Sequence, residues 1–288
     1  MVNTSACLQT STLARQPACR LVFQQSCRLP AKQTCLSACL LARYSRFVLI
    51  AFANSKGGVG KSTLAVHLAV WLYDRGKQVA LLDTDKQRSS SAWAAEAEPK
   101  LTIRTASTHE EVALSVQELS ETHEFIVADA PGGLEELSRT VLILADLAFF
   151  PVLPSILDLR SVAEATKLLK FAQSINGGRP EGRLILNRLR KRDRISRELT
   201  EAAPALGLTV AHTTIRDLQA YRNAAQQGTV VTRMGARERD AAAEVTQLFV
   251  ELMTDKLVFV ERDQDQLADD SEIAIGEGRA NGKASLAK

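Results

Sequence analysis

A glycine-rich loop that ends in Gly-Lys-Ser is the first sign of chemistry in this sequence. The loop occupies residues 54–63 and reads NSKGGVGKST. Triphosphate oxygens need several hydrogen-bond donors that converge on them, so the backbone must turn its N–H groups inward without intruding side chains. Gly57, Gly58 and Gly60 permit such a turn. An apolar strand precedes the loop and a helical pattern follows it, which is the order that a phosphate-binding loop requires.

Side chains and a helix terminus complete the predicted phosphate site. The unpaired amides at the start of the following helix, together with the positive end of its dipole, attract anions. We expect Lys61 to reach the β- and γ-phosphates, Ser62 to ligate Mg²⁺ and Thr63 to add a phosphate contact. ATP and Mg²⁺ are therefore the expected cofactors. The predicted ATP-binding loop consists of Gly57, Gly58, Val59, Gly60, Lys61, Ser62 and Thr63.

Acidic residues end two of the apolar strands that follow the loop. Asp83 and Asp85 come at the end of one strand, and Asp129 ends another that reads FIVAD. Carboxylates at the carboxyl end of a strand beside a phosphate loop can accept a hydrogen bond from an attacking water and hold Mg²⁺. We expect Asp129 to be the carboxylate on the metal side, and Asp85 to lie close enough to the metal to contribute.

Alternating strands and helices must position these residues. The pattern predicts an α/β fold, a doubly wound and mostly parallel sheet flanked by helices, as a single domain of the P-loop NTPase type. Helices are expected in the gaps between strands, and a closing helix at Ala241–Leu257. The predicted strands are Phe47–Ala53, Gln78–Asp83, Leu101–Thr105, Glu124–Asp129, Leu147–Val152 and Arg183–Asn187.

A helix is expected directly after the first strand and the glycine loop. Leu64, Leu68 and Trp71 recur at helical spacing, so one face of this helix is expected to be apolar. Gly76 stands where a left-handed C-terminal cap belongs. His67 is expected to pack against its neighbours.

The two ends of the chain differ from the rest. Residues 1–46 carry six bases, no acid and all five cysteines, and we interpret them as an irregular or disordered extension. A targeting segment and a misassigned translation start remain alternatives. An odd number of cysteines without a tight CxxC pair argues against a disulfide framework and against a metal site. We expect residues 258–288 to form a disordered acidic tail, which leaves 47–257 as the ATPase domain.

The loop departs from the commonest phosphate-loop pattern, because Ser55 replaces a glycine and Lys56 adds a lysine. Here the chain resembles the ParA/MinD family of deviant Walker-A ATPases, whose KGGxGK[ST] loop matches Lys56–Ser62 at every fixed position. The likeness covers about Phe47–Leu257 and is greatest with partition-type members. It implies that Lys56 reaches the nucleotide of a partner subunit, so that ATP holds two protomers face to face.

The same resemblance assigns roles to the acidic residues. It gives Asp85 the task of positioning the attacking water and Asp83 a supporting role, so the expected catalytic set is Lys56, Lys61, Asp83 and Asp85. Lys86 and Arg88 stand where the family usually has Pro and Gly, which makes the shape of this loop uncertain from the sequence.

Residues later in the chain resemble the part of the family that contacts the base. Asn187 can offer a donor and an acceptor to an adenine edge. The stretch Thr214–Asp217, together with Ala220–Arg222 and Gly228, is expected to close over the base.

A basic run suggests DNA as a partner. Arg188, Arg190, Lys191, Arg192, Arg194 and Arg197 are opposed only by Asp193. Phosphate contacts of this kind give binding that tolerates any sequence and weakens with salt. A merely solvated helix face is the alternative, because charge runs are common at helix starts. Residues 47–260 have no net charge, so any attraction to DNA must come from this local patch. The predicted DNA-binding residues are Arg188, Arg190, Lys191, Arg192 and Arg194.

The resemblance favours a switch that partitions DNA or positions cargo in the cytoplasm, on the nucleoid. Its ATP dimer would bind DNA without sequence preference, and a ParB-like or cargo-bound adaptor would stimulate hydrolysis. Plasmid, chromosome, conjugation machinery and protein clusters are equally compatible cargoes.

Other functions are also considered. A MinD-like membrane ATPase needs a basic amphipathic C-terminal helix, whereas this tail is acidic. Iron–sulfur relatives need cysteines within the ATPase fold, and ligase-type relatives need a dedicated substrate pocket. A module that binds ATP without cleaving it, and a conjugation-related ParA-like ATPase, stay open. No run of 18 apolar residues is present, so no membrane-spanning segment is expected. The acidic tail should also be repelled by anionic lipid, so no membrane partner is expected.

Overall fold

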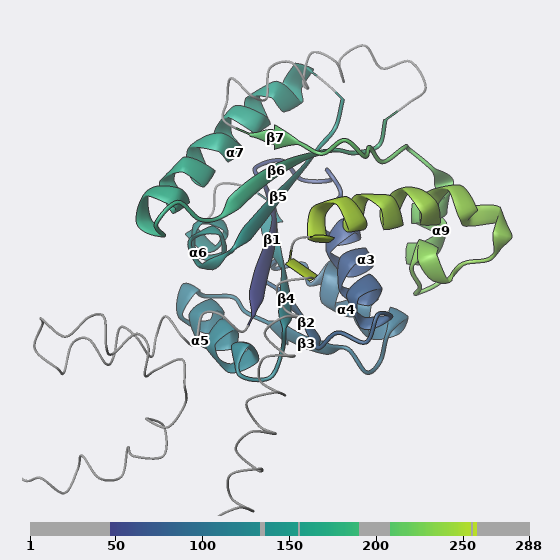
Figure 1. Ribbon diagram of the computed structural model, residues 1–288, viewed down its shortest axis with the longest axis horizontal. Coiled ribbons are helices and arrows are strands. Elements are labelled where there is room, and N and C mark those ends of the chain that lie inside the picture. Colours follow the sequence, from purple (N-terminus) through teal and green to yellow (C-terminus); the bar gives the residue numbers. More distant parts are fainter. Residues whose placement is uncertain (1–46, 133–135, 155, 190–207, 255, 258–288) are drawn as a thin grey trace, which may run out of the picture. The chain divides into compact units, whose positions relative to one another are not determined.

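A seven-stranded parallel sheet forms the centre of the protein (Figure 1). The computed structural model describes residues 47–132, 136–154, 156–189, 208–254 and 256–257. The strand order is β3-β2-β4-β1-β5-β6-β7, and every pairing is parallel. The predicted doubly wound α/β fold is confirmed. The strands are β1 Val48–Asn54, β2 Val79–Asp83, β3 Thr102–Thr105, β4 Phe125–Gly132, β5 Leu147–Val152, β6 Glu181–Leu186 and β7 Thr209–Val210.

Helices cover both faces of the sheet (Figure 1). One face packs against α5, α6 and α7, and the other against α3, α4, α9 and a closing helix at residues 239–254. The described helices are α3 Lys61–Tyr73, α4 Ser89–Ala97, α5 His109–Ser120, α6 Glu136–Leu144, α7 Ile156–Ile175 and α9 Gln219–Gln226, with the short 3₁₀ helices η3 Val231–Arg233 and η4 Ala236–Glu238. No helix in these described ranges is long and apolar enough to cross a bilayer.

The central strand β1 explains why the strands read as continuous apolar runs. Ile50 and Phe52 belong to the core on the α3 side, while Leu49 and Ala51 belong to the core on the α7 side. All four side chains are inaccessible to solvent. A parallel sheet covered on both faces has no polar face, so period-two alternation disappears.

Three local expectations are corrected by the structure. Helix α3 is buried on all sides from Leu64 to Leu72, because it lies between the sheet, α4 and the closing helix, so it has no exposed polar face. Strand β7 was not predicted, since two residues are too few to show a pattern. Strand β6 ends at Leu186, so Asn187 lies just beyond it. Gly76 does adopt the predicted left-handed conformation, with φ 74°.

Candidate nucleotide-binding site

The glycine loop follows β1. Its shape is set by the side chain of Asn54 and by two glycines in the left-handed region. Asn54, the last residue of β1, donates from Nδ2 to the Pro151 carbonyl at 2.6 Å and accepts from the Lys56 amide at 3.0 Å. Gly58 and Gly60 have φ of 75° and 99°, in the left-handed region that side chains disfavour. Helix α3 starts directly after Gly60 without a side-chain cap, so its first amides face the loop.

Lys61 is buried at the start of α3, with its ammonium directed across the loop. Its Nζ lies 3.5 Å from the Lys56 carbonyl oxygen. A methyl group placed on Gly132, at the end of β4, would lie 3.6 Å from this nitrogen. Burial lowers the pKa of Lys61, and the nearby carboxylates of Asp129 and Asp85 oppose that shift. The cation is thus held between the loop and the acidic strand ends.

Asp129 lies within β4, three residues before the strand ends at Gly132 and not at its end as predicted, and it lacks hydrogen-bond partners among the described residues. It is 1% exposed, and neither carboxylate oxygen has a hydrogen-bond partner among the described residues. Burial raises the pKa of Asp129 to about 6. The hydroxyls of Ser62 and Ser90 lie near enough to oppose this rise, but neither meets ordinary hydrogen-bond geometry. A buried carboxylate without a partner is costly unless a cation or a proton joins it.

These surroundings fit a magnesium ion. Mg²⁺ usually binds through one or two protein oxygens together with phosphates and water. Ser62 and Asp129 supply such a pair beside the loop, and no cluster of three acidic, histidine or cysteine side chains forms a closed cage in the described part of the chain. The sequence predicted Ser62, Asp129 and Asp85 as metal ligands; Ser62 lies beside Asp129, and Asp85 is close enough to influence Lys61, and the assignment of all three stays a prediction.

Asp83 and Asp85 differ in what they contact. Asp83 is buried, and its two oxygens accept from the amides of Asp85 and Ser91 at 3.0 and 2.8 Å. It therefore shapes the loop between β2 and α4. Asp85 is partly exposed and accepts from the Gln87 amide at 3.0 Å. Within the described ranges, this is the one hydrogen bond of the Asp85 carboxylate.

Arg88 takes a glycine-like conformation in the same loop. Its φ of 51° lies in the left-handed region, and it directly precedes α4. The sequence left the loop shape open because Arg88 replaces a usual glycine. The structure keeps the left-handed turn in spite of the side chain, at a conformational cost of about 1–2 kcal/mol.

A cavity of about 240 Å³ continues from the glycine loop. Two of the predicted base-closing segments line it, through Ile215–Asp217 and Tyr221–Arg222. Ala220 is buried in the core instead. Gly228 lies against Glu96, where an added methyl group would come within 2.5 Å of a carboxylate oxygen. The cavity is lined by Gly58, Gly60, Thr63, Leu64, Asn187, Arg188, Ile215, Arg216, Asp217, Leu218, Tyr221, Arg222 and Ala225.

Asn187 joins the cavity to the loop. Its Nδ2 donates to the Val59 carbonyl at 2.7 Å, and its Oδ1 accepts from the Arg188 amide at 2.9 Å. A methyl group on Gly60 would lie 2.2 Å from Nδ2, so this contact also requires the glycine. The sequence predicted only a contact with a base. In the structure the side-chain amide anchors the glycine loop through the Val59 carbonyl.

Three carboxylates of the closing helix accept hydrogen bonds from residues 212–216, a segment that leads into the wall of the cavity. Glu244 accepts from both the backbone amide and Nε of Arg216, and Asp240 accepts from Nη2 of the same arginine at 3.1 Å. Glu251 accepts from the amides of His212 and Thr213 at 2.7 and 2.8 Å. The sequence analysis missed these carboxylates. Their spacing of four and seven residues, which places them on one helical face, was the available signal.

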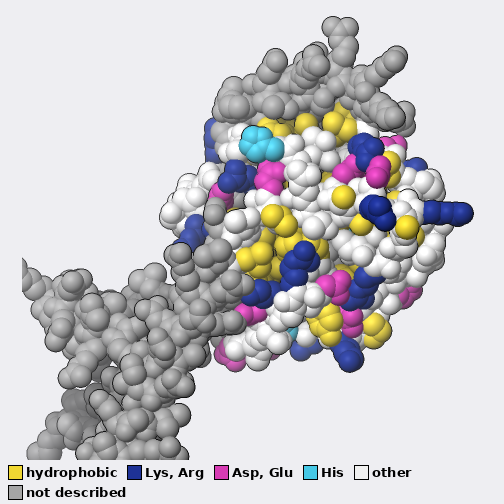
Figure 2. Space-filling model, turned by 45° about the vertical axis from the view of Figure 1, so that its right-hand side comes forward, with side chains coloured by type: hydrophobic (Ala, Val, Ile, Leu, Met, Phe, Trp, Pro, Cys, Tyr) yellow, Lys and Arg dark blue, Asp and Glu magenta, His cyan; other side chains and the backbone are white. Residues whose placement is uncertain are grey.

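The predicted DNA-binding residues are only partly visible. Arg188 lies at the mouth of the cavity, where Asp217 Oδ1 accepts from Nε of Arg188 at 3.4 Å and from Nη1 of Arg222 at 3.3 Å. On the face that brings α9 forward, charges of both signs are interspersed (Figure 2). The other four, Arg190, Lys191, Arg192 and Arg194, lie outside the described residues.

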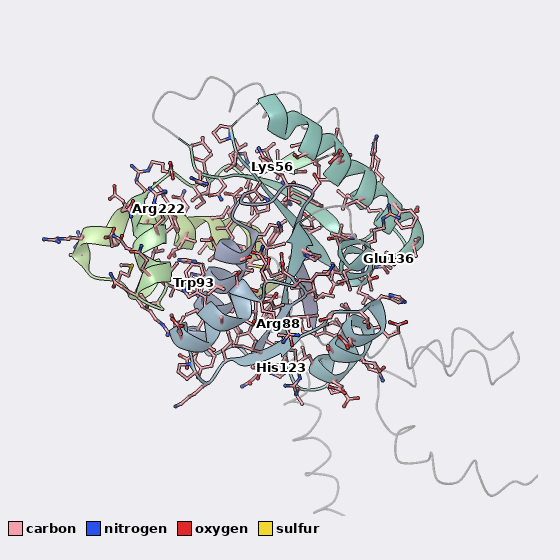
Figure 3. All side chains as sticks on the ribbon, turned by 180° about the vertical axis from the view of Figure 1, so that it is seen from behind. Lys56, Arg88, Trp93, His123, Glu136 and Arg222 are labelled. Atoms are coloured by element: carbon pink, nitrogen blue, oxygen red, sulfur yellow. The ribbon has the colours of Figure 1, made fainter. Side chains whose placement is uncertain are left out.

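Lys56 and Arg222 come from opposite parts of the site. Lys56 belongs to the glycine loop, and Arg222 to α9 (Figure 3). Lys56 is partly exposed, and its backbone is fixed by Asn54 on one side and Lys61 on the other. The main chain of Lys56 is thus fixed while its side chain remains partly accessible.

Comparison with known proteins agrees with this geometry. Residues 50–245 match the family model described as the CobQ/CobB/MinD/ParA nucleotide binding domain. The chain belongs to this family. The predicted relationship to ParA/MinD ATPases is therefore confirmed, and nucleotide binding follows as the property of the matched domain.

Individual relatives extend the comparison. The chain is 31% identical over 209 residues to "Maintenance of carboxysome distribution protein A" of Halothiobacillus neapolitanus, across 71% of this chain and 95% of that protein. An ATP complex of a Cyanothece McdA variant has a TM-score of 0.58 at 16% identity, and covers 72% of this chain and 96% of that one. MinD from Aquifex aeolicus has a TM-score of 0.57 at 18% identity, with 72% and 97% covered. These two structures share the fold.

Proposed function

We propose that this protein is an ATP-hydrolysing switch that positions a cargo by cycling between an ATP-bound dimer and a released state. The observation that supports this most directly is the unpartnered, buried Asp129 beside the loop that contains Lys56 and Lys61. This carboxylate is adapted to a cation that arrives with a triphosphate. The membership of the ParA/MinD family supports the same activity.

The residues of the site suggest how hydrolysis proceeds. Lys61 and the amides at the start of α3 bind the β- and γ-phosphates and offset charge that develops on them. Asp85 is partly exposed at the carboxyl edge of the sheet, so it can accept a hydrogen bond from the attacking water. Asp83 holds the loop that carries Asp85. Mg²⁺, when bound by Ser62 and Asp129, would neutralise further phosphate charge.

A slow, partner-dependent switch fits this site better than a metabolic catalyst. Phosphoryl transfer depends mainly on positioning and charge neutralisation, and Lys56 lies partly exposed in the loop. The family resemblance assigns Lys56 to the nucleotide across such a dimer. A ParB-like or cargo-bound adaptor would then stimulate hydrolysis.

The cargo is proposed from the relatives. One relative is named for carboxysome distribution and another is named protein ParA. We infer that the cargo is a large assembly in the cytoplasm, which the protein moves while it binds DNA without sequence preference. The basic run that begins at Arg188 would contact the DNA. MinD-like membrane positioning is the second candidate, since MinD of Helicobacter pylori is 24% identical over 182 residues.

Dimerisation tests the proposal. Asp85→Ala, with Mg·ATP, is expected to form a stable dimer by light scattering, because nucleotide is bound but not cleaved. Adding Lys56→Ala should return it to a monomer, whereas Lys100→Ala, an exposed lysine outside the site, should leave the dimer intact. A chain that stays monomeric with saturating Mg·ATP would exclude the sandwich dimer.

DNA retention separates the two positioning functions. Reversing Arg190, Arg192 and Arg194 to Glu is expected to abolish ATP-dependent retention on DNA while the dimer persists. Unchanged retention would remove the basic run as the DNA contact. ATP-dependent pelleting with anionic vesicles and no DNA retention would instead favour the MinD-like function.

A further inference from the structure

His67 lies at a junction directly behind the nucleotide cavity. It is 1% exposed and occupies α3 one turn after Thr63, which lines the cavity. Its Nδ1 lies 2.7 Å from the Thr63 carbonyl oxygen, and its Nε2 lies 3.2 Å from the Val231 amide of η3. The ring therefore connects the first turn of the phosphate-loop helix to a segment 164 residues away.

The hydrogen-bond partners determine the state of the ring. An amide can only donate, so Nε2 must accept from Val231, and the proton of the neutral ring is on Nδ1, from which it is donated to the Thr63 carbonyl. Burial lowers the pKa of His67 to about 4, so the neutral ring persists at neutral pH. Both ring nitrogens are therefore committed to contacts within the protein.

Aromatic contacts extend this junction to the outer wall of the cavity. The His67 ring centroid is 5.6 Å from that of Tyr221 in α9, and Tyr221 lines the cavity. On its other side the ring lies 5.4 Å from Trp93 of α4 in an edge-on arrangement. Trp93 in turn donates from Nε1 to the Thr229 carbonyl at 2.9 Å, just before η3. Segments on both walls of the cavity thus meet at one imidazole.

We propose that His67 is a positioning residue that sets the distance between the phosphate loop and the nucleoside wall of the cavity. The inference rests on the proposed nucleotide site and adds a specific element to it. If His67 couples the two walls, its loss should weaken binding of a nucleoside triphosphate but not binding of inorganic tripolyphosphate, which needs only the loop. A merely structural role would leave the ratio of the two affinities unchanged.

Two substitutions separate the contacts of the ring. His67→Phe keeps an aromatic ring against Tyr221 and Trp93 but leaves the buried Val231 amide without an acceptor. His67→Gln can still offer an acceptor to that amide from a similar position. We expect His67→Phe to lower the affinity for ATP about tenfold, with tripolyphosphate affinity within twofold of wild type. We expect His67→Gln to restore most of the loss.

Calorimetric titration of the full chain with ATP and, separately, with tripolyphosphate measures this ratio. Phe249→Leu is the matched control, because Phe249 is fully buried in the same core against Trp71 and does not line the cavity. It should lower stability without changing the ratio. An unchanged ratio in both folded His67 variants would overturn the inference alone. Wild-type protein that binds neither probe would overturn the proposed function as well.

Discussion

The two ends of the nucleotide cavity are built in different ways. The phosphate end consists of one continuous loop, whose backbone geometry is local, and of Asp83 and Asp129 on the neighbouring strands β2 and β4. The nucleoside end combines Asn187 with residues 215–225, and the closing helix holds this wall through Asp240, Glu244 and Glu251. The first end depends on backbone conformation, the second on contacts between distant segments.

This difference predicts that the two ends can be damaged separately. Substitutions at the phosphate end should affect ATP and tripolyphosphate equally, because both ligands share the phosphates. Substitutions that loosen the wall should affect ATP alone. Ordered from the largest expected effect to the smallest, the following changes test that separation.

Lys61→Ala should have the largest effect. It removes the buried cation from the phosphate end, so we expect affinity for both ATP and tripolyphosphate to fall at least about 100-fold, by analogy with losing a charge-assisted contact of roughly 3 kcal/mol. Titration calorimetry measures both affinities. Lys100→Ala, exposed and outside the site, is the matched control. Loss of ATP binding with tripolyphosphate binding preserved would contradict the proposed division of the cavity.

Asp129→Asn should show that the ionised Asp129 carboxylate lowers the free energy of unfolding of the protein without nucleotide. The folded pKa of about 6 exceeds the ordinary value of 3.8, so stability is lost as the pH rises through 6. The neutral amide should therefore raise the free energy of unfolding at pH 8, without nucleotide, by up to about 3 kcal/mol. Denaturant titration measures this. Magnesium-dependent tightening of ATP binding should be lost.

Asp146 supplies the control for that substitution. It is also a partly buried aspartate whose pKa is raised by burial, but it accepts from the Leu49 amide and from Arg179. Asp146→Asn should therefore lower stability. If both substitutions raised the free energy of unfolding, the effect at Asp129 could not be attributed to its lack of hydrogen-bond partners.

His67 should make the free energy of unfolding depend on pH in the acidic range. Its folded pKa of about 4 lies below the ordinary 6.5, so the unfolded chain takes up a proton first. Stability is complete above pH 6.5 and falls as the pH decreases toward 4, by up to about 3 kcal/mol. The difference in unfolding free energy between wild type and His67→Gln across this range isolates the effect, since Asp129 shifts both proteins alike. Parallel curves would contradict it.

Glu244→Gln should loosen only the nucleoside end. It weakens the hold on the main chain and side chain of Arg216, so we expect ATP affinity to fall about fivefold to tenfold, or roughly 1 kcal/mol. Tripolyphosphate affinity should not change. Glu238→Gln, at a partly exposed residue just before the same helix, is the control. An equal loss for both ligands would show that the wall also supports the loop.

Arg88→Gly should produce the smallest effect, and in the favourable direction. Relief of the left-handed backbone is partly offset by the greater freedom of glycine in the unfolded chain. We expect a gain of about 0.5–1 kcal/mol in unfolding free energy, measured by thermal and denaturant melts. Arg88→Ala retains the Cβ atom and should show no gain. If both substitutions raised the free energy of unfolding, the effect would be due to removal of the Arg88 charge and not to relief of the backbone.

The residues 54–63 determined the phosphate end from the sequence alone. A glycine loop between a strand and a helix has few possible conformations, so the left-handed turns at Gly58 and Gly60 and the site of Lys61 follow from local spacing. Placing Asp83 at the end of β2 and Asp129 within β4 required only the alternation of strands and helices, although β4 continues to Gly132, beyond the predicted end at Asp129. Their side chains meet because β2 and β4 pair in register at these two residues.

Only the tertiary structure decided the nucleoside end. Asn187 reaches Val59 across 128 residues, His67 reaches Val231 across 164, and the carboxylates of the closing helix hold a segment that has little regular structure of its own. Spacing along the chain says nothing about such pairs, because they form when helices pack against the sheet. The sequence therefore predicted the loop at residues 54–63 as the phosphate-binding element, while packing determined how the rest of the cavity is held around this loop.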